Sequence, residues 1–148
     1  MSDPVFHRFL PDSRWAGVSV LAYKEDGGTF RSVTRQVLFD GDPALPVQLR
    51  YFEVAAGGHS TLEKHQHVHL VWISRGRGKV YLGGRVLDVA QGDVLTIPTW
   101  TWHQFRAFDG PLGFHCLVAV DRDKPTLPDD EAWQALTRDP LAAAFLKR

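Results

Sequence analysis

Short apolar segments recur along most of the chain, with turn residues between them. They are rich in Val, Leu, Phe, Tyr and Trp, a composition typical of strands rather than of long helices. Gly83-Gly84 alone separates two of them, which predicts a tight hairpin because glycine adopts the positive φ that such turns need. Short strands at regular spacing predict an all-β sandwich or barrel. The predicted strands are 18–23, 32–39, 47–54, 70–74, 79–82, 85–89, 93–97, 102–108 and 114–120.

The C-terminal part of the chain has a different pattern. Asp129 or Asp130 can cap a short helix that runs to about Thr137, and Asp139-Pro140 can begin a second helix over 141–147. We expect these helices to cover an open barrel end or a sheet edge, with a dimer contact as the alternative. The whole chain, 1–148, is predicted to be one domain. Its parts are N-terminal strands within 15–39, a barrel core over about 48–120 and a helical segment over 129–147.

Composition narrows the possible partners. The 17 Lys and Arg residues balance 17 Asp and Glu residues, and no basic run is present, which argues against nucleic acid as a partner. No segment approaches the roughly 20 apolar residues of a membrane span, and the polar N-terminal residues do not form a secretory signal. We therefore expect a cytoplasmic protein with a small-molecule partner and no membrane partner.

Histidine is the residue type that suggests chemistry. The chain has seven His but one Cys, so a bound metal would be held by imidazole rather than thiolate. Side chains two residues apart point to the same side of an extended chain. A strand face that carries three imidazoles and a carboxylate suits an apolar core poorly, so it is either solvated or holds a metal. The potential ligands spaced in this way are Glu63, His65, His67 and His69.

The glycine and proline residues around this run resemble the motifs of the cupin family. The family's first motif is G-x5-H-x-H-x3-4-E-x6-G and its second is G-x5-P-x-G-x2-H-x3-N. The resemblance implies a double-stranded β-helix, the jelly-roll cupin barrel, here followed by short C-terminal helices. It also implies a homodimer. The matching segments are Gly57-x5-Glu63-x-His65-x3-His69-x6-Gly76 and Gly92-x5-Pro98-x-Trp100-x2-His103.

The chain departs from these motifs at four positions. Glu63 stands where the family has its first His, and His69 stands where it has Glu, so the two ligand types are exchanged but both are kept. Trp100 replaces a glycine, and Ala107 stands where some members have Asn. An alternative register that pairs the histidines of His65-x-His67 would put Val71 at the acid position. The metal ligands that the resemblance implies are Glu63, His65, His69 and His103.

Three imidazoles and one carboxylate suit a range of divalent metals. We expect one ion per chain, which can be Fe, Mn, Ni, Cu or Zn, because affinity alone does not select among them. A six-coordinate ion with four protein ligands would leave two positions for substrate, or for substrate and O₂. A four-coordinate zinc would leave none, which separates an enzyme from a structural site.

Side chains on neighbouring segments are candidates for the wall of the site. Tyr51 and His67 are the candidate catalytic residues, because either can serve as a general base if it faces the pocket. Aromatic residues near the ligands form either a ligand pocket or simply the core. Arg50 either binds an anion or points outward in a salt bridge, and Cys116 is either a pocket residue or an inert buried thiol. The candidate pocket residues are Arg50, Phe52, Trp72, Trp100, Trp102, Phe105 and Cys116.

The resemblance implies a metal-binding protein that acts on a small organic molecule. Our first expectation is a mononuclear metal-dependent enzyme with dioxygenase-type oxidation, since the ligand set resembles that of oxidative cupins. A sugar isomerase or epimerase, or a lyase, is the enzymatic alternative. A non-catalytic cupin that binds or senses a small ligand or a metal is the other alternative, because one fold serves many functions.

Overall fold

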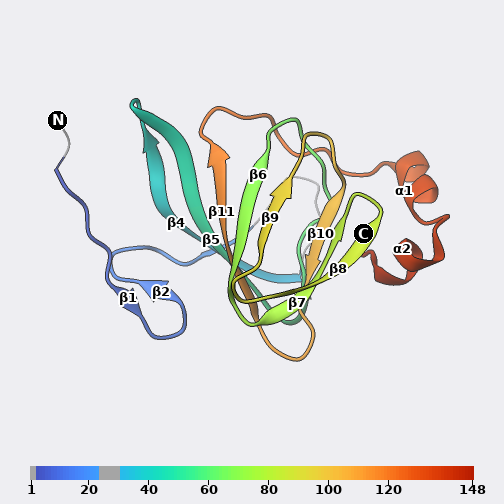
Figure 1. The fold of residues 1–148 in the computed structure, drawn as a ribbon, viewed down its shortest axis with the longest axis horizontal. Coiled ribbons are helices and arrows are strands. Elements are labelled where there is room, and N and C mark those ends of the chain that lie inside the picture. Colours follow the sequence, from blue (N-terminus) through green and yellow to red (C-terminus); the bar gives the residue numbers. More distant parts are fainter. Residues whose placement is uncertain (1–2, 24–30) are drawn as a thin grey trace.

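The structure, a computed structural model, describes residues 3–23 and 31–148, and strands make up most of it. The sequence also predicts a turn at Asp26-Gly27-Gly28, and these residues lie outside the described part of the chain. The all-β prediction is confirmed (Figure 1). The strands are β1 (Phe9–Leu10), β2 (Arg14–Trp15), β3 (Leu21–Ala22), β4 (Arg31–Asp42), β5 (Leu45–His59), β6 (His69–Arg75), β7 (Arg77–Leu82), β8 (Arg85–Ala90), β9 (Val94–Ile97), β10 (His103–Arg106) and β11 (Leu112–Ala119).

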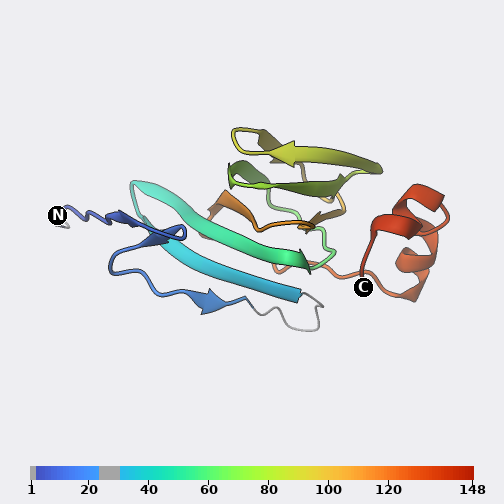
Figure 2. The same cartoon turned by 90° about the horizontal axis from the view of Figure 1, so that it is seen from below.

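One antiparallel sheet curls into a half-barrel. Its strand order is β8-β7-β10-β5-β11-β6-β9, and β4 pairs with β5 and also carries β3. As a consequence of this curl, the β7–β8 hairpin lies in a layer above the long β4–β5 pair (Figure 2). β1 and β2 form a separate small hairpin at the end opposite the helices. Residues far apart in the sequence therefore face one another across the interior of the curl.

The predicted strands all have counterparts, with shifted ends. The predicted strand 18–23 is reduced to β3, whereas β5 extends well beyond the predicted 47–54. The predicted hairpin is confirmed, since Leu82 pairs with Arg85 and both glycines between them have positive φ.

The interior of the curl is filled by side chains from alternate strand positions. Buried residues of β5, β6, β9, β10 and β11 form this main core, and Val54, Val71, Ile97 and Leu112 have no exposed surface at all. The period of two predicts this arrangement, because every second residue of a strand faces inward.

Two short helices close one end of the sheet. α1 spans Asp130–Leu136 and α2 spans Pro140–Phe145, close to the predicted segments. The carboxylates of Asp129 and Asp139 accept hydrogen bonds from backbone N–H groups in the first turns. Phe145 of α2 packs in a second apolar cluster with Leu62 and Tyr81. Among the described residues no helix is long and apolar enough to cross a membrane.

Packing between β5 and β11 gives a test of the fold. A Cβ at Gly113 would overlap the hydroxyl of buried Tyr51, which donates a hydrogen bond to Glu53. We expect Gly113→Ala to lower the free energy of unfolding by about 1–3 kcal/mol, as overpacked cores do. Gly110→Ala is the matched control, because nothing lies within 4 Å of its Cβ position, and we expect a change within about 0.5 kcal/mol. Urea unfolding measures both, and equal values for the two variants would contradict the packing argument.

Candidate metal centre

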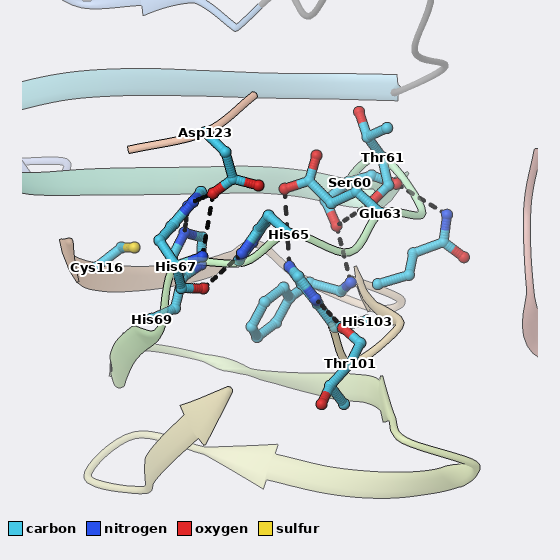
Figure 3. Close-up of polar contacts among 12 residues, drawn as sticks. Ser60, Thr61, Glu63, His65, His67, His69, Thr101, His103, Cys116 and Asp123 are labelled. Carbon is cyan, nitrogen blue, oxygen red and sulfur yellow. Dashed lines mark hydrogen bonds and ion pairs between the residues drawn. The ribbon is translucent and has the colours of Figure 1, made fainter. Parts of the chain in front are cut away.

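Three histidines converge inside the curl. One donor nitrogen from each of His65, His69 and His103 lies within 4.8 Å of the other two (Figure 3). His69 begins β6 and His103 begins β10, while His65 lies in the connection between β5 and β6. The sheet topology therefore brings together residues from both predicted motifs.

The segment that carries the predicted ligands is not a regular strand. Glu63 and His103 exchange two backbone hydrogen bonds, with N···O distances of 3.2 and 3.0 Å, and the chain then bends at residues 66 and 67. The carboxylate of Asp123 accepts hydrogen bonds from the backbone N–H groups at this bend. Despite the bend, Glu63, His67 and His69 line one cavity.

Backbone carbonyls orient two of the imidazoles. Nδ1 of His65 lies 2.7 Å from the carbonyl oxygen of His67, and Nδ1 of His103 lies 2.9 Å from that of Thr101. A carbonyl only accepts hydrogen bonds, so Nδ1 carries the proton and Nε2 presents its lone pair. Nε2 of His65 is buried without a hydrogen-bond partner, an arrangement that is costly unless a cation is bound. This donor set fits a divalent metal.

The same environment keeps these imidazoles uncharged. Burial, with smaller contributions from His103 and His67, lowers the pKa of His65 to about 4. Burial followed by His103 and His65 also holds the pKa of His69 well below its usual range. Neutral imidazole is the form that binds metal, so both rings are ready to do so at neutral pH.

Glu63 stands beside the three histidines. Its Oε1 lies 3.7 Å from Nε2 of His103, and the carboxylate lines the cavity. It is not within the 4.8 Å group, which contains the histidines only. The carboxylate is thus placed where it can join them as the fourth ligand that the resemblance implies.

His67 lies between the histidine group and an acid that the sequence did not point to. Its Nδ1 is 2.7 Å from Oδ1 of Asp123, its Nε2 is 3.1 Å from Nε2 of His69, and its ring stacks on that of His65. Burial lowers the pKa of His67 although Asp123 opposes the shift. For Asp123, burial acts to raise the pKa, but hydrogen bonds from Gln66 and His67 outweigh it and hold the pKa well below its usual range. Asp123 therefore stays ionised and orients His67. Asp123 belongs to none of the motifs, so sequence reasoning had no signal with which to select it.

A cavity of about 180 Å³ opens beside the histidines. Among the predicted pocket residues, Arg50, Phe52, Phe105 and Cys116 line it, as does His67. His65 is almost wholly buried and lies outside this lining. The other lining residues are Tyr23, Val33, Arg35, Ser60, Thr61, Glu63, His69, His103, Phe114, Arg122 and Pro125.

Arg50 points inward, so the alternative of an outward salt bridge is wrong. It is 5% exposed, and its Nη2 donates a hydrogen bond to Sγ of Cys116 over 3.3 Å. Burial raises the pKa of the Cys116 thiol, although the neighbouring guanidinium acts in the opposite direction. Cys116 is therefore a protonated thiol in the cavity wall.

The structure places Tyr51 and Trp72 away from the cavity. Each alternates with residues that face inward, so its own side chain is on the outer face of the sheet. The Tyr51 hydroxyl donates to Glu53, and burial raises the pKa of Tyr51 to about 12. Trp72 stacks on His115 with ring centroids 5.0 Å apart. Tyr51 is not placed to act as a base in this cavity.

Two more tryptophans lie outside the cavity. Trp100 is 54% exposed, in a turn where its φ of 54° is positive. Trp102 packs against the second apolar cluster, and the ammonium of Lys64 lies 4.8 Å from its ring centroid. Both precede β10, and only from His103 onward does the chain enter the inner sheet.

The comparisons with known proteins agree with this architecture. A family model described as the cupin domain matches residues 50–118. The chain is 55% identical over 146 residues to a Rhodospirillum rubrum protein named 1-methylthio-D-xylulose 5-phosphate methylsulfurylase, covering 97% of this chain and 93% of that one. This chain belongs to the cupin family.

Two solved cupin structures show how far the fold extends. A cupin 2 conserved barrel domain protein from Rhodopseudomonas palustris is 46% identical, with a TM-score of 0.91 and coverage of 97% of this chain and 100% of that one. A cupin-2 domain protein from Rhodospirillum rubrum is 54% identical, with a TM-score of 0.85 and coverage of 95% of each chain. The jelly-roll prediction for this cupin is thereby confirmed.

The family motif has a physical basis in this cupin. Gly76, the last glycine of the first motif, has a φ of 69°, and a Cβ there would overlap the carbonyl oxygen of Pro111. Only glycine fits such a turn without strain. The turn connects β6, which begins with His69, to β7, which pairs with the strand that carries His103.

Metal content tests the histidine centre directly. After loading with Mn(II) or Zn(II) and gel filtration, we expect elemental analysis to find one ion per chain in the wild type. We expect His69→Ala to lower metal affinity by at least about tenfold, because even indirect disturbance of a ligand has that effect. His59→Ala is the control, since His59 lies outside the cavity lining. Equal metal content in the wild type and His69→Ala would refute the site.

Proposed function

We propose that this cupin is a metal-dependent enzyme that acts on 1-methylthio-D-xylulose 5-phosphate at the histidine-lined cavity. The observation that carries the proposal is the 55% identity, over 97% of the chain, to the Rhodospirillum rubrum methylsulfurylase of that name. The fold alone would not carry it, because cupin barrels serve many functions. The cavity described above supplies groups that suit each part of such a substrate.

His65, His69 and His103, with Glu63 beside them, would hold the metal ion. When bound, a divalent ion would act as a Lewis acid toward an oxygen atom of the sugar. Fe, Mn, Ni, Cu and Zn all remain compatible with imidazole and carboxylate donors. Because the imidazoles are neutral, one carboxylate leaves the centre with a net positive charge that favours an oxygen ligand.

Three phenylalanines provide an apolar wall. Phe114 stacks on Phe105 with centroids 4.3 Å apart and on Phe52 with centroids 5.7 Å apart, and all three rings line the cavity. A wall of this kind excludes water and makes favourable contacts with a thioether sulfur. It therefore suits the methylthio group of the proposed substrate.

His67 and Asp123 form a pair that can hold a proton. Asp123 accepts the Nδ1 proton of His67, which directs Nε2 of His67 toward His69 in the cavity. Nε2 can then accept a proton or return one to a bound molecule. Between the two catalytic candidates from the sequence, the cavity favours His67, because Tyr51 is on the outer face.

Other functional expectations stay predictions. They are dioxygenase-type oxidation and the isomerase, lyase and non-catalytic alternatives. The homodimer and the cytoplasmic location likewise stay predictions.

Turnover of the named compound is the test. Protein loaded with each of the five metals is incubated with 1-methylthio-D-xylulose 5-phosphate, with and without dithiothreitol as a small thiol, and ¹H NMR follows the methylthio protons. We expect the carbon-bound methylthio signal to disappear with at least one metal. His69→Ala should lower the rate at least about 100-fold, as loss of a metal ligand removes the charge that assists the reaction. His59→Ala should retain the rate.

An unchanged spectrum with every metal, with and without thiol, from protein that elemental analysis shows to be loaded would overturn the proposal. Loss of the substrate only together with O₂ uptake would keep the proposed substrate and support the dioxygenase prediction for the reaction.

A further inference from the structure

Three arginines line the same cavity as the histidines. Arg35 comes from β4, Arg50 from β5 and Arg122 from the segment after β11. β5 lies between β4 and β11, and its inward residue Arg50 pairs with Cys116 of β11. Arg35 pairs with Phe52, the next inward residue of β5, so Arg35 and Arg50 share one face of the sheet.

In the described part of the chain none of these guanidinium groups is paired with an acid in a salt bridge. Arg50 is 95% buried, and the Nε atoms of Arg35 and Arg50 are buried without a hydrogen-bond partner. On the outer face, by contrast, Arg75 binds Glu53 at 2.7 Å. A buried cation without a counter-ion is costly, which indicates that an anion binds here.

The remaining contacts hold Arg50 and Arg122 in place but do not neutralise their positive charges. Nη1 and Nη2 of Arg122 donate to the carbonyl oxygen of Ala119 and to Oε1 of Gln48, at 2.9 and 3.0 Å. The Arg50 guanidinium lies 4.8 Å from the ring centroid of Phe52 and donates to the Cys116 sulfur, a weak acceptor. Burial, followed by the charges of Arg50 and Arg35, lowers the pKa of Arg122, in keeping with closely grouped cations. The guanidinium groups of Arg50 and Arg122 are thus fixed before a ligand arrives.

We propose that Arg35, Arg50 and Arg122 form a phosphate-binding subsite, which takes the phosphate monoester group of a small sugar phosphate. Three forked cations suit a dianion with three terminal oxygens better than they suit a single carboxylate. The identity of the sugar rests on the proposed function, whereas the phosphate subsite rests on the arginines alone. In this arrangement the arginines bind the phosphate end of the molecule, and the histidine centre receives its oxygen-rich part.

Inorganic phosphate is the first probe. Isothermal titration of metal-loaded wild type and of Arg122→Gln is expected to show at least tenfold weaker binding to the variant, with Arg50→Gln weaker still. Arg75→Gln is the matched control on the outer face and should bind as the wild type does. Circular dichroism checks that each variant is folded, and Arg122 is the safer site because it is only partly buried. Arg50→Lys keeps the positive charge but loses the planar, forked guanidinium group, so its phosphate affinity should fall between those of the wild type and Arg50→Gln.

Two results of the phosphate titrations would overturn the three-arginine subsite. Phosphate binding that survives Arg50→Gln and Arg122→Gln, but disappears in His69→Ala, would mean that phosphate binds the metal. Binding that Arg75→Gln weakens as much as Arg122→Gln does would mean a general effect of charge. Either result refutes the three-arginine subsite.

The substrate gives a second and separate measurement. For the wild type, kcat/KM should be at least tenfold higher for 1-methylthio-D-xylulose 5-phosphate than for 1-methylthio-D-xylulose, and Arg122→Gln should remove most of that preference through KM. A preference that Arg122→Gln leaves intact would refute the subsite. Arginine-dependent phosphate binding without turnover of either sugar would instead refute the proposed function and leave the subsite standing.

Discussion

The two backbone hydrogen bonds between Glu63 and His103 are the contact on which the site depends. They join the bent connection before β6 to the start of β10, two segments separated by the whole β7–β8 hairpin. With that join in place, His65 lies against His103 and the Glu63 carboxylate lies beside the histidine group. The N–H of Trp100 adds a hydrogen bond to the carbonyl oxygen of His65 at 2.7 Å, so backbone contacts hold residues 63–65 against the start of β10.

Burial has opposite electrostatic consequences in two parts of the cavity. The imidazoles respond by losing their charge, since their pKa values fall below the neutral range. The guanidinium groups cannot respond in that way, because arginine stays protonated in proteins. The cavity therefore combines neutral donors for a cation with fixed cations for an anion. A molecule with oxygen ligands at one end and phosphate at the other would satisfy both.

Much of the fold follows from local pattern. The apolar segments and glycine turns predicted the strands, and two Asp caps predicted the helices close to where they lie. The spacing of the motifs also predicted which histidines meet. The aromatic wall was harder to predict, because Trp72, Trp100 and Trp102 are near the ligands in sequence but face elsewhere. Proximity along the chain does not fix the face of a strand or the side of a turn.

The sequence by itself determined the all-β class and the hairpin, because strand periodicity and turn residues are local properties of the chain, and the resemblance to the cupin motifs predicted the histidines of the candidate metal centre. Only the tertiary structure decided that Asp123 orients His67 and that Arg35 and Arg122 join Arg50 in one cavity. These residues come from distant segments with no shared motif. The curl of the sheet brings them together, and its packing leaves the arginines without acidic partners in the described part of the chain.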